Sequence, residues 1–206
     1  GVWFPDKTKV GWWKNGYPQY FDKAINSLNF ITIRVFVNNE ELDLNIFNPS
    51  RFERTLDMYN GILRREFEVT IGDIILKCRT ERFYSISDPE TAFIKYSIIP
   101  NKDCHIKYIS VLDGNVWNQD SNHGEQFWNP VDSEVIDGLI QYTSIKTKPN
   151  NFGVDQYVVS GAALCDSNGD LTMSKSHDFQ SEVTYEKNTM ANEVFKIHKK
   201  VAILTT

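Results

Sequence analysis

The sequence contains few cysteines and no long apolar run. Its three cysteines, Cys78, Cys104 and Cys165, are scattered and odd in number, which argues against a disulfide framework or a cysteine-based metal site. We interpret them as buried, reduced thiols and predict a cytoplasmic location. No apolar stretch approaches the roughly 18–20 residues that a membrane-spanning helix requires, so we expect no membrane partner.

An excess of basic residues is also missing. Lys and Arg number 22 against 27 Asp and Glu, and the formal net charge is −5. A nucleic-acid surface needs a basic face that releases counterions from the phosphates. Nucleic acid is therefore not an expected partner.

The motifs of common catalytic and cofactor sites do not occur. The sequence has no Gly-Xaa-Ser-Xaa-Gly elbow, P-loop, dinucleotide fingerprint or paired-histidine zinc motif,. The string 166–170 begins like a calcium-binding loop, but its glycine comes two places early and His177 stands where a glutamate should close it. We interpret Asn168-Gly169 as a hairpin turn instead. We expect no metal, no cofactor and no catalytic residue in this chain.

What the sequence does contain is alternation of apolar and polar residues in short runs separated by turns, the pattern of half-buried antiparallel strands. Asn38-Asn39 and Gly72-Asp73 have the residue types that tight hairpins require. Many strands without a long helix predict an all-β sandwich or barrel. The predicted strands lie at residues 31–37, 42–46, 63–69, 74–78, 92–99, 105–112, 139–147, 157–164, 179–185 and 194–204.

One segment departs from this pattern. Tyr17 to Leu28 has apolar residues at helical spacing, with Pro18 where a first helical turn tolerates it,. A short helix and an extended segment are both open there. No linker or repeat divides the sequence, so residues 1–206 are predicted to form one domain. Its apolar start and the strand-like run 201–204 near its end suggest that it is cut from a longer protein at both ends,.

The most unusual segment is a polar and aromatic loop at residues 113–130. Sugar sites combine flat aromatic rings with side chains that bond hydroxyl groups, and this loop has that mixture. Long loops in compact domains are often functional. The alternative is that the aromatic rings anchor the loop on its own sandwich or on a neighbouring domain. If the loop contacts sugar, the predicted substrate-binding residues are Trp117, Asn118, Asp120, Asn122, Glu125 and Trp128.

Carboxylates in this loop do not by themselves indicate catalysis. Glycosidic chemistry needs at least two carboxylates, and the loop contains three acidic residues, Asp113, Asp120 and Glu125. A catalytic pair also needs a fixed separation and burial that raises one pKa, and a sequence shows neither.

Three strings resemble glycoside hydrolase family 65, and among its members the maltose phosphorylases. Residues 4–21 resemble a segment near the start of those enzymes. Residues 54–63, Arg-Thr-Leu-Asp-Met-Tyr-Asn-Gly-Ile-Leu, are similar to a signature of the family. Residues 113–128 resemble the corresponding loop, with Asn-Gln-Asp-Ser-Asn at 118–122 and Glu-Gln-Phe-Trp at 125–128. The resemblance covers almost the whole chain.

The resemblance implies an N-terminal β-super-sandwich of antiparallel sheets, of the galactose-mutarotase-like kind. Catalysis would belong to an (α/α)6 barrel that this chain lacks. In the family reaction, phosphate attacks the anomeric carbon of an α-glucoside while a Glu of the barrel protonates the departing oxygen, which yields inverted β-glucose 1-phosphate. The implied partners are that barrel in the same polypeptide, a disaccharide, inorganic phosphate and a second copy in a homodimer. The fragment alone is expected to be inactive.

Two other functions stay open. The chain could be a self-sufficient carbohydrate-binding or mutarotase-like module, in which case Asp113, His123 and Glu125 would be the groups to test. It could also belong to a family 65 hydrolase, because the residues that separate a hydrolase from a phosphorylase would lie outside this chain.

Overall fold

A computed structural model describes residues 2–9, 20–118, 126–149, 153 and 155–206; for residues 2–9 and 20–23 it describes the backbone. Within these ranges the chain forms fifteen strands and no helix. Every paired strand runs antiparallel to its neighbour. The predicted all-β architecture of antiparallel sheets is therefore confirmed.

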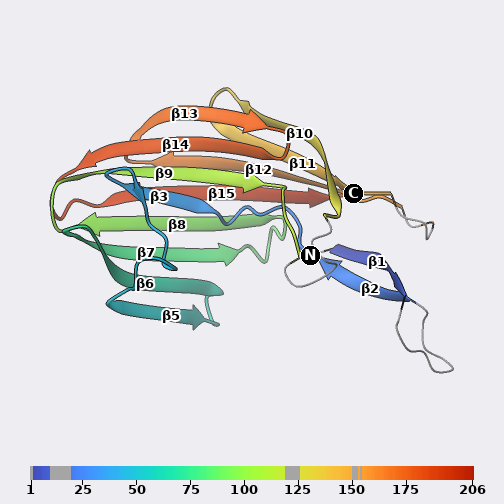
Figure 1. The fold of residues 1–206 in the computed structure, drawn as a ribbon, viewed down its shortest axis with the longest axis horizontal. Coiled ribbons are helices and arrows are strands. Elements are labelled where there is room, and N and C mark those ends of the chain that lie inside the picture. The colour runs from blue at the N-terminus through green and yellow to red at the C-terminus, as the bar shows by residue number, and fades with distance from the viewer. Residues whose placement is uncertain (1, 10–19, 119–125, 150–152, 154) are drawn as a thin grey trace.

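The strands form two main sheets and one separate hairpin (Figure 1). The large sheet has eight strands, in the spatial order β10 (Trp128–Ile136), β11 (Ile140–Thr147), β12 (Val158–Ser167), β15 (Phe195–Thr205), β8 (Thr91–Pro100), β7 (Ile74–Tyr84), β6 (Ile62–Ile71) and β5 (Arg51–Asp57). The small sheet has five, in the order β13 (Asp170–His177), β14 (Gln180–Thr189), β9 (Cys104–Asp113), β3 (Ile33–Val37) and β4 (Glu40–Glu41). The hairpin is β1 (Val2–Lys9) with β2 (Tyr20–Ile25).

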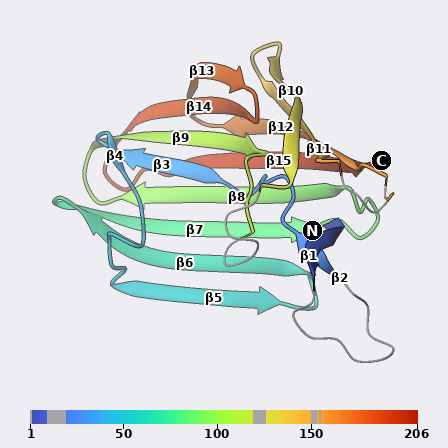
Figure 2. The same ribbon diagram turned by 45° about the vertical axis from the view of Figure 1, so that its right-hand side comes forward.

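The small sheet covers only part of the large one. In Figures 1 and 2, β5 and β6 lie beyond the side of the small sheet that β3 and its short partner β4 form. The β1–β2 hairpin lies at the end of the sandwich where β9 and β15 terminate. Accordingly, β5 is exposed at every position except its last residue, Asp57.

The core lies between the two sheets and follows the predicted alternation. Interior strands such as β7, β8, β12 and β15 bury alternate residues over much of their length, because successive side chains of a strand point to opposite faces. The burial of β7, for example, alternates along its first six residues. Among the alternating apolar residues of the predicted strands, Ile31 and Ile46 are exposed, whereas the following are buried: Val35, Val37, Phe67, Val69, Ile74, Leu76 and Cys78.

Two of the predicted hairpin turns are confirmed. Asn38 and Asn39 adopt φ angles of 48° and 70° between β3 and β4. Gly72 adopts a φ of 58° between β6 and β7. Positive φ is the conformation that Asn and Gly tolerate at the tip of a two-residue hairpin. The predicted partner strand at 42–46 is wrong in its position, since β4 is limited to Glu40–Glu41 and turns follow it.

The predicted hairpin at Asn168-Gly169 is wrong. These residues join β12 of the large sheet to β13 of the small sheet, so the chain crosses between sheets here. The side chain of Asn168 bonds the backbone at both Val194 and Lys196, which holds the crossing against β15. A Cβ on Gly169 would lie 2.6 Å from the Phe195 ring. Glycine is required here for close approach rather than for a reversal of direction.

The helix that was one option for residues 17–28 is also wrong within the described part. Residues 20–25 form β2, which pairs with β1, and no helix follows at 26–28. Residues 17–19 lie outside the described residues. The apolar spacing has another cause, because Ile25 and Leu28 are buried against the loop that follows β9.

A buried polar network joins the two sheets. The Gln141 amide on β11 donates to the backbone oxygens of Ser110 and Ser181, at 3.0 and 2.7 Å. Its carbonyl oxygen accepts a hydrogen bond from the Ser110 hydroxyl at 2.8 Å. Ser110 lies on β9 and Ser181 on β14, so one side chain ties a strand of the large sheet to two strands of the small sheet. Buried amides are stabilising only when they are paired in this way.

Two tyrosines make the same connection from the other side. The Tyr108 hydroxyl donates to the Phe195 oxygen, and the Tyr185 hydroxyl donates to the Cys165 oxygen, each at 3.0 Å. Both rings lie in the core, and both acceptors belong to the large sheet.

The three cysteines are free and buried, as predicted. Burial raises the pKa of Cys78 to about 12, so that thiol stays protonated.

Lys199 completes the connection between the sheets. It projects from β15 into the core with 1% exposure. Its ammonium donates to the Val111 oxygen at 2.7 Å and to the Thr32 oxygen at 3.4 Å. Burial disfavours the charged form and lowers the pKa of Lys199 to about 8 from 10.5,.

This pKa predicts how stability depends on pH. Because the unfolded chain binds the extra proton between pH 8 and pH 10.5 while the native chain does not, the free energy of unfolding should rise through this window,. The rise from Lys199 is at most about 1.4 kcal/mol per pH unit. Urea denaturation from pH 7 to 10.5 should show this component in the wild type and not in Lys199→Met. Lys200→Met, on the opposite face of β15, serves as the control and should keep it. Identical pH profiles for the wild type and Lys199→Met would contradict the assignment.

Candidate functional site

The candidate loop begins where β9 ends, at a glycine that fits a narrow space. A Cβ on Gly114 would lie 2.4 Å from the Ile145 Cγ2 atom. Its amide donates to the Phe179 oxygen at 2.8 Å. The next amide, that of Asn115, donates to the Asp113 carboxylate at 2.8 Å. The direction in which the chain leaves β9 is therefore fixed by packing and by hydrogen bonds.

The first part of the loop is held against the segment that follows β2. The Asn118 side chain accepts a hydrogen bond from the Asn26 amide at 2.7 Å and donates to the Ala24 oxygen at 2.9 Å. The Asn26 side chain donates to the Trp117 oxygen at 2.8 Å. Further along, the backbones of Asn29 and Asp113 exchange two hydrogen bonds. Residues about ninety positions apart in the sequence are thus joined side by side.

The second part of the loop is held by Trp128. Its indole is 1% exposed and packs in a cluster with Ile25, Leu28 and Ile145. The ring N–H donates to the Asn26 oxygen at 2.7 Å. A buried tryptophan needs such an acceptor for its one polar atom. Trp128 therefore anchors the loop on its own sandwich, and both ends of the loop are attached to the same short segment.

Trp117 has a different environment. Its side chain is 47% exposed, and it borders an open hollow of about 630 Å³. Residues 26–31 line one part of this hollow and residues 113–117, without Gly114, line another; Val159, Ile203 and Thr205 complete the lining. A flat exposed ring beside backbone and amide groups is an arrangement that can pack on the apolar face of a sugar and bond its hydroxyls.

Several polar groups of this hollow were not predicted from the sequence. Asn26, Ser27 and Asn29 line it from one side and Asn115 from the other. The Ser27 hydroxyl is buried and has no hydrogen-bond partner in the part of the chain that the structure describes. The polar residues of the string Asn-Ser-Leu-Asn at 26–29 were the available signal, but the helical spacing of the apolar residues around them pointed to a different structure.

The structure does not describe the remaining predicted residues. Asp120, Asn122 and Glu125, together with His123, lie outside the described residues. Asp113 is the one carboxylate among the described residues that line the hollow. No group of three His, Cys, Asp or Glu side chains within the described ranges is arranged to hold a metal ion. Nor do the described residues contain a helix of the length and apolarity needed to cross a bilayer.

Comparison with solved structures confirms the class of fold. A structure named as a kojibiose phosphorylase from the human microbiome superimposes with a TM-score of 0.84 over 100% of this chain. The chain covers 26% of that protein, at 24% sequence identity. The likeness establishes that both contain the same sandwich.

The sequence comparisons identify the family. Residues 1–206 match the model of the glycosyl hydrolase family 65, N-terminal domain. The chain belongs to this family.

Curated relatives are longer proteins. The maltose phosphorylase of Bacillus subtilis (strain 168) is 40% identical over 100% of this chain, which covers 27% of that protein. The α,α-trehalose phosphorylase of Thermoanaerobacter brockii is 25% identical over 79% of this chain, across 22% of its own length. The kojibiose phosphorylase of the same organism is 34% identical over 48% of this chain, across 14% of its own length. The chain thus spans about a quarter of the maltose phosphorylase.

The different environments of the two tryptophans lead to a prediction about stability. Trp128→Ala removes a buried ring and leaves the Asn26 oxygen without its donor, so the free energy of unfolding should fall by about 3–5 kcal/mol. Trp117→Ala removes a half-exposed ring and should cost less than about 1 kcal/mol. Urea denaturation followed by far-UV circular dichroism measures both. Equal losses in the two variants would contradict the anchoring role of Trp128.

Proposed function

We propose that the chain is the non-catalytic N-terminal domain of an inverting disaccharide phosphorylase of the cytoplasm, which converts maltose and phosphate to β-glucose 1-phosphate and glucose. The observation that carries the proposal is the family match over residues 1–206, together with 40% identity to a maltose phosphorylase of which this chain covers 27%. The general acid and the phosphate site would lie on an (α/α)6 barrel in the same polypeptide. A homodimer of the complete protein is part of the proposal.

The loop after β9 would reach the rim of the sugar site. The set proposed to contact the sugar or to position the loop for it is the one predicted from the sequence: Trp117, Asn118, Asp120, Asn122, Glu125 and Trp128. Trp117 supports a stacking role, because its ring is half exposed at the hollow. Asn118 and Trp128 support a positioning role, because their polar atoms already bond the segment after β2. Residues 120, 122 and 125 lie between these two anchors in the sequence and would be presented to the substrate.

The chemistry of the reaction explains why a domain can contact the sugar without being catalytic. Glycosyl transfer to phosphate needs one proton donor and one anionic nucleophile on opposite sides of the anomeric carbon. Binding energy from parts of the sugar that do not react can be used to orient that carbon. A loop with stacking and amide groups supplies this kind of contact without taking part in bond cleavage.

Kinetics of the complete enzyme test the role of the loop. Trp117→Ala should raise the KM for the disaccharide several-fold, because it removes a contact made to the bound sugar, while the KM for phosphate and the thermal stability change little. Met173→Ala, a change of an exposed residue on β13, provides the control. An unchanged KM for the disaccharide in Trp117→Ala would contradict the proposed contact.

The isolated 206-residue chain tests the assignment as a non-catalytic domain. Incubated with maltose and inorganic phosphate, it should release no glucose 1-phosphate above the level of a heat-treated sample. Its tryptophan fluorescence should show no saturable response to glucose. Turnover at enzyme-like rates would refute the proposal, and a saturable response with Asp113→Asn sensitivity would favour a self-sufficient carbohydrate-binding module.

A further inference from the structure

Three arginines converge on the open inner face of the large sheet. Arg54 on β5 is paired directly with Arg65 on β6. Arg82 on β7 is paired with Leu63, two positions from Arg65 on β6. They share the inner face of these strands with the buried Phe67, since residues two apart on a strand point the same way. Here we call Arg54, Arg65 and Arg82 the arginine triad.

The triad lines a single cavity of about 120 Å³. The other lining residues are uncharged and come from β6, β7, β8 and the start of β3: Leu63, Thr80, Ile94, Tyr96, Ile31 and Ile33. Tyr96 and Ile94 are buried. The cavity has the size of one small ionic group rather than of a disaccharide, and its lining places three positive charges among apolar side chains.

None of these guanidinium groups has an anionic partner among the described residues. No ion pair or side-chain hydrogen bond joins Arg54, Arg65 or Arg82 to another described residue, and their recorded contacts are to aromatic rings: Arg54 lies 5.8 Å from the Phe52 ring and Arg65 lies 5.2 Å from the Phe67 ring. The Arg65 Nε atom is buried and has no hydrogen-bond partner in the described part of the chain. A buried donor on a charged group without a partner is costly, and like charges directly opposite each other on neighbouring strands repel.

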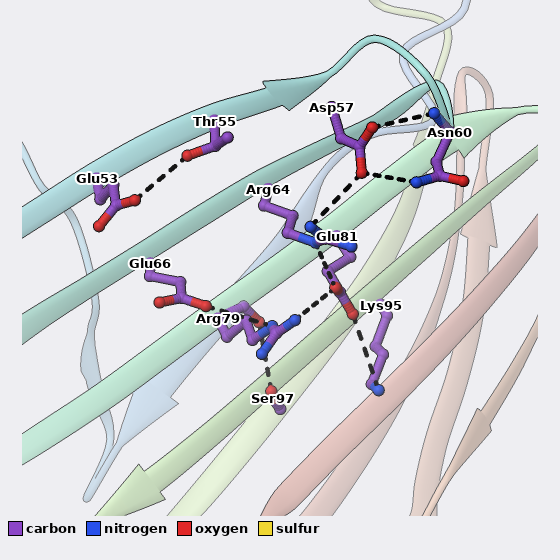
Figure 3. A network of polar contacts seen from close by, with 10 residues as sticks. All are labelled: Glu53, Thr55, Asp57, Asn60, Arg64, Glu66, Arg79, Glu81, Lys95 and Ser97. Atoms are coloured by element: carbon purple, nitrogen blue, oxygen red, sulfur yellow. Dashed lines mark hydrogen bonds and ion pairs between the residues drawn. The ribbon is translucent and has the colours of Figure 1, made fainter.

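The opposite face of the same strands provides the contrast. Figure 3 shows the arginines of that outer face among carboxylates. Arg64 bonds Glu81 at 3.1 Å and lies 3.8 Å from Asp57. Arg79 bonds Glu81 at 2.7 Å and lies 3.5 Å from Glu66. The carboxylates of β5, β6 and β7 thus compensate the outer arginines and leave the inner triad uncompensated.

We propose that the arginine triad is a binding site for an oxyanion, a phosphate or carboxylate group that enters the 120 Å³ cavity. Guanidinium groups bind such oxygens through two parallel N–H donors and remain charged at all physiological pH values. One anion would satisfy the Arg65 Nε atom and relieve the repulsion between Arg54 and Arg65. The group can come from a dissolved anion or from an acidic side chain elsewhere in the longer protein. Phe52 and Leu56, two positions to either side of Arg54 on β5, are 46% and 60% exposed, so the surface beside Arg54 is accessible to an anion from either source.

Titration of the 206-residue chain with inorganic phosphate tests the site. Isothermal titration calorimetry at low ionic strength should show one saturable site whose affinity falls with added salt. Arg65→Gln and Arg82→Gln should each weaken binding at least tenfold. Arg64→Gln is the matched control, because it removes the same charge from the neighbouring residue on the opposite face, and it should leave binding unchanged. Circular dichroism verifies that each variant is folded.

The longer protein that carries this domain distinguishes the two sources. If a dissolved anion is the ligand, the Arg65-dependent phosphate site persists there. If an acidic side chain fills the cavity, that site is lost and Arg65→Gln lowers the melting temperature by several degrees more than Arg64→Gln. Either result supports the proposal. Two results together would overturn the proposal. The 206-residue chain would bind no phosphate, or would bind it equally well with Arg65→Gln, and the two variants of the longer protein would have equal melting temperatures.

Discussion

The architecture depends on a small set of polar side chains buried between the sheets. Gln141 and Lys199 project from the large sheet and bond backbone oxygens of the small sheet, while Tyr108 and Tyr185 do so in the opposite direction. Apolar packing alone tolerates many relative positions of two sheets, because it is not directional. These bonds are directional, and each unpaired group would be costly. They therefore set how the small sheet lies on the large one, and with it the position at which β9 ends and the candidate loop begins.

The sequence was sufficient to predict the interior strands, because a strand with one buried face carries its alternation in the sequence. Edge strands were missed for the same reason. Strands β5 and β13 are exposed at nearly every position, and β10 is buried mainly at its first residue, Trp128. Each lies at an edge of its sheet, where pairing is decided by a neighbour and not by a pattern within the strand. The crossing between sheets at Asn168-Gly169 was misread because these residue types are typical of turns. Here Asn168 bonds the backbone at Val194 and Lys196, in a segment distant in the sequence.

The candidate loop could be found from its composition, but the roles of its residues could not. Trp117 and Trp128 are equivalent in a sequence, and they differ because Trp128 meets Ile25, Leu28 and the Asn26 oxygen across about a hundred residues. The same long-range contact places residues 26–29 along one side of the hollow, in a region where the apolar spacing at 17–28 had left a short helix and an extended segment both open. Likewise, the signature at 54–63 was readable as a family string, whereas the lack of anionic partners around Arg54 among the described residues becomes visible only when β5, β6 and β7 are paired.

The attachment of the loop has a mechanical consequence. Ala24, Asn26 and Asn29 hold it at several points. This segment continues directly from β2, which among the described strands pairs with β1 alone. Hydrogen bonds at residues 24–29 therefore connect β2 directly to the described parts of the loop. A contact that displaced the hairpin would therefore change the position of the Trp117 ring without touching that ring. Substitutions in the hairpin, away from the hollow, would then alter how Trp117 borders the hollow.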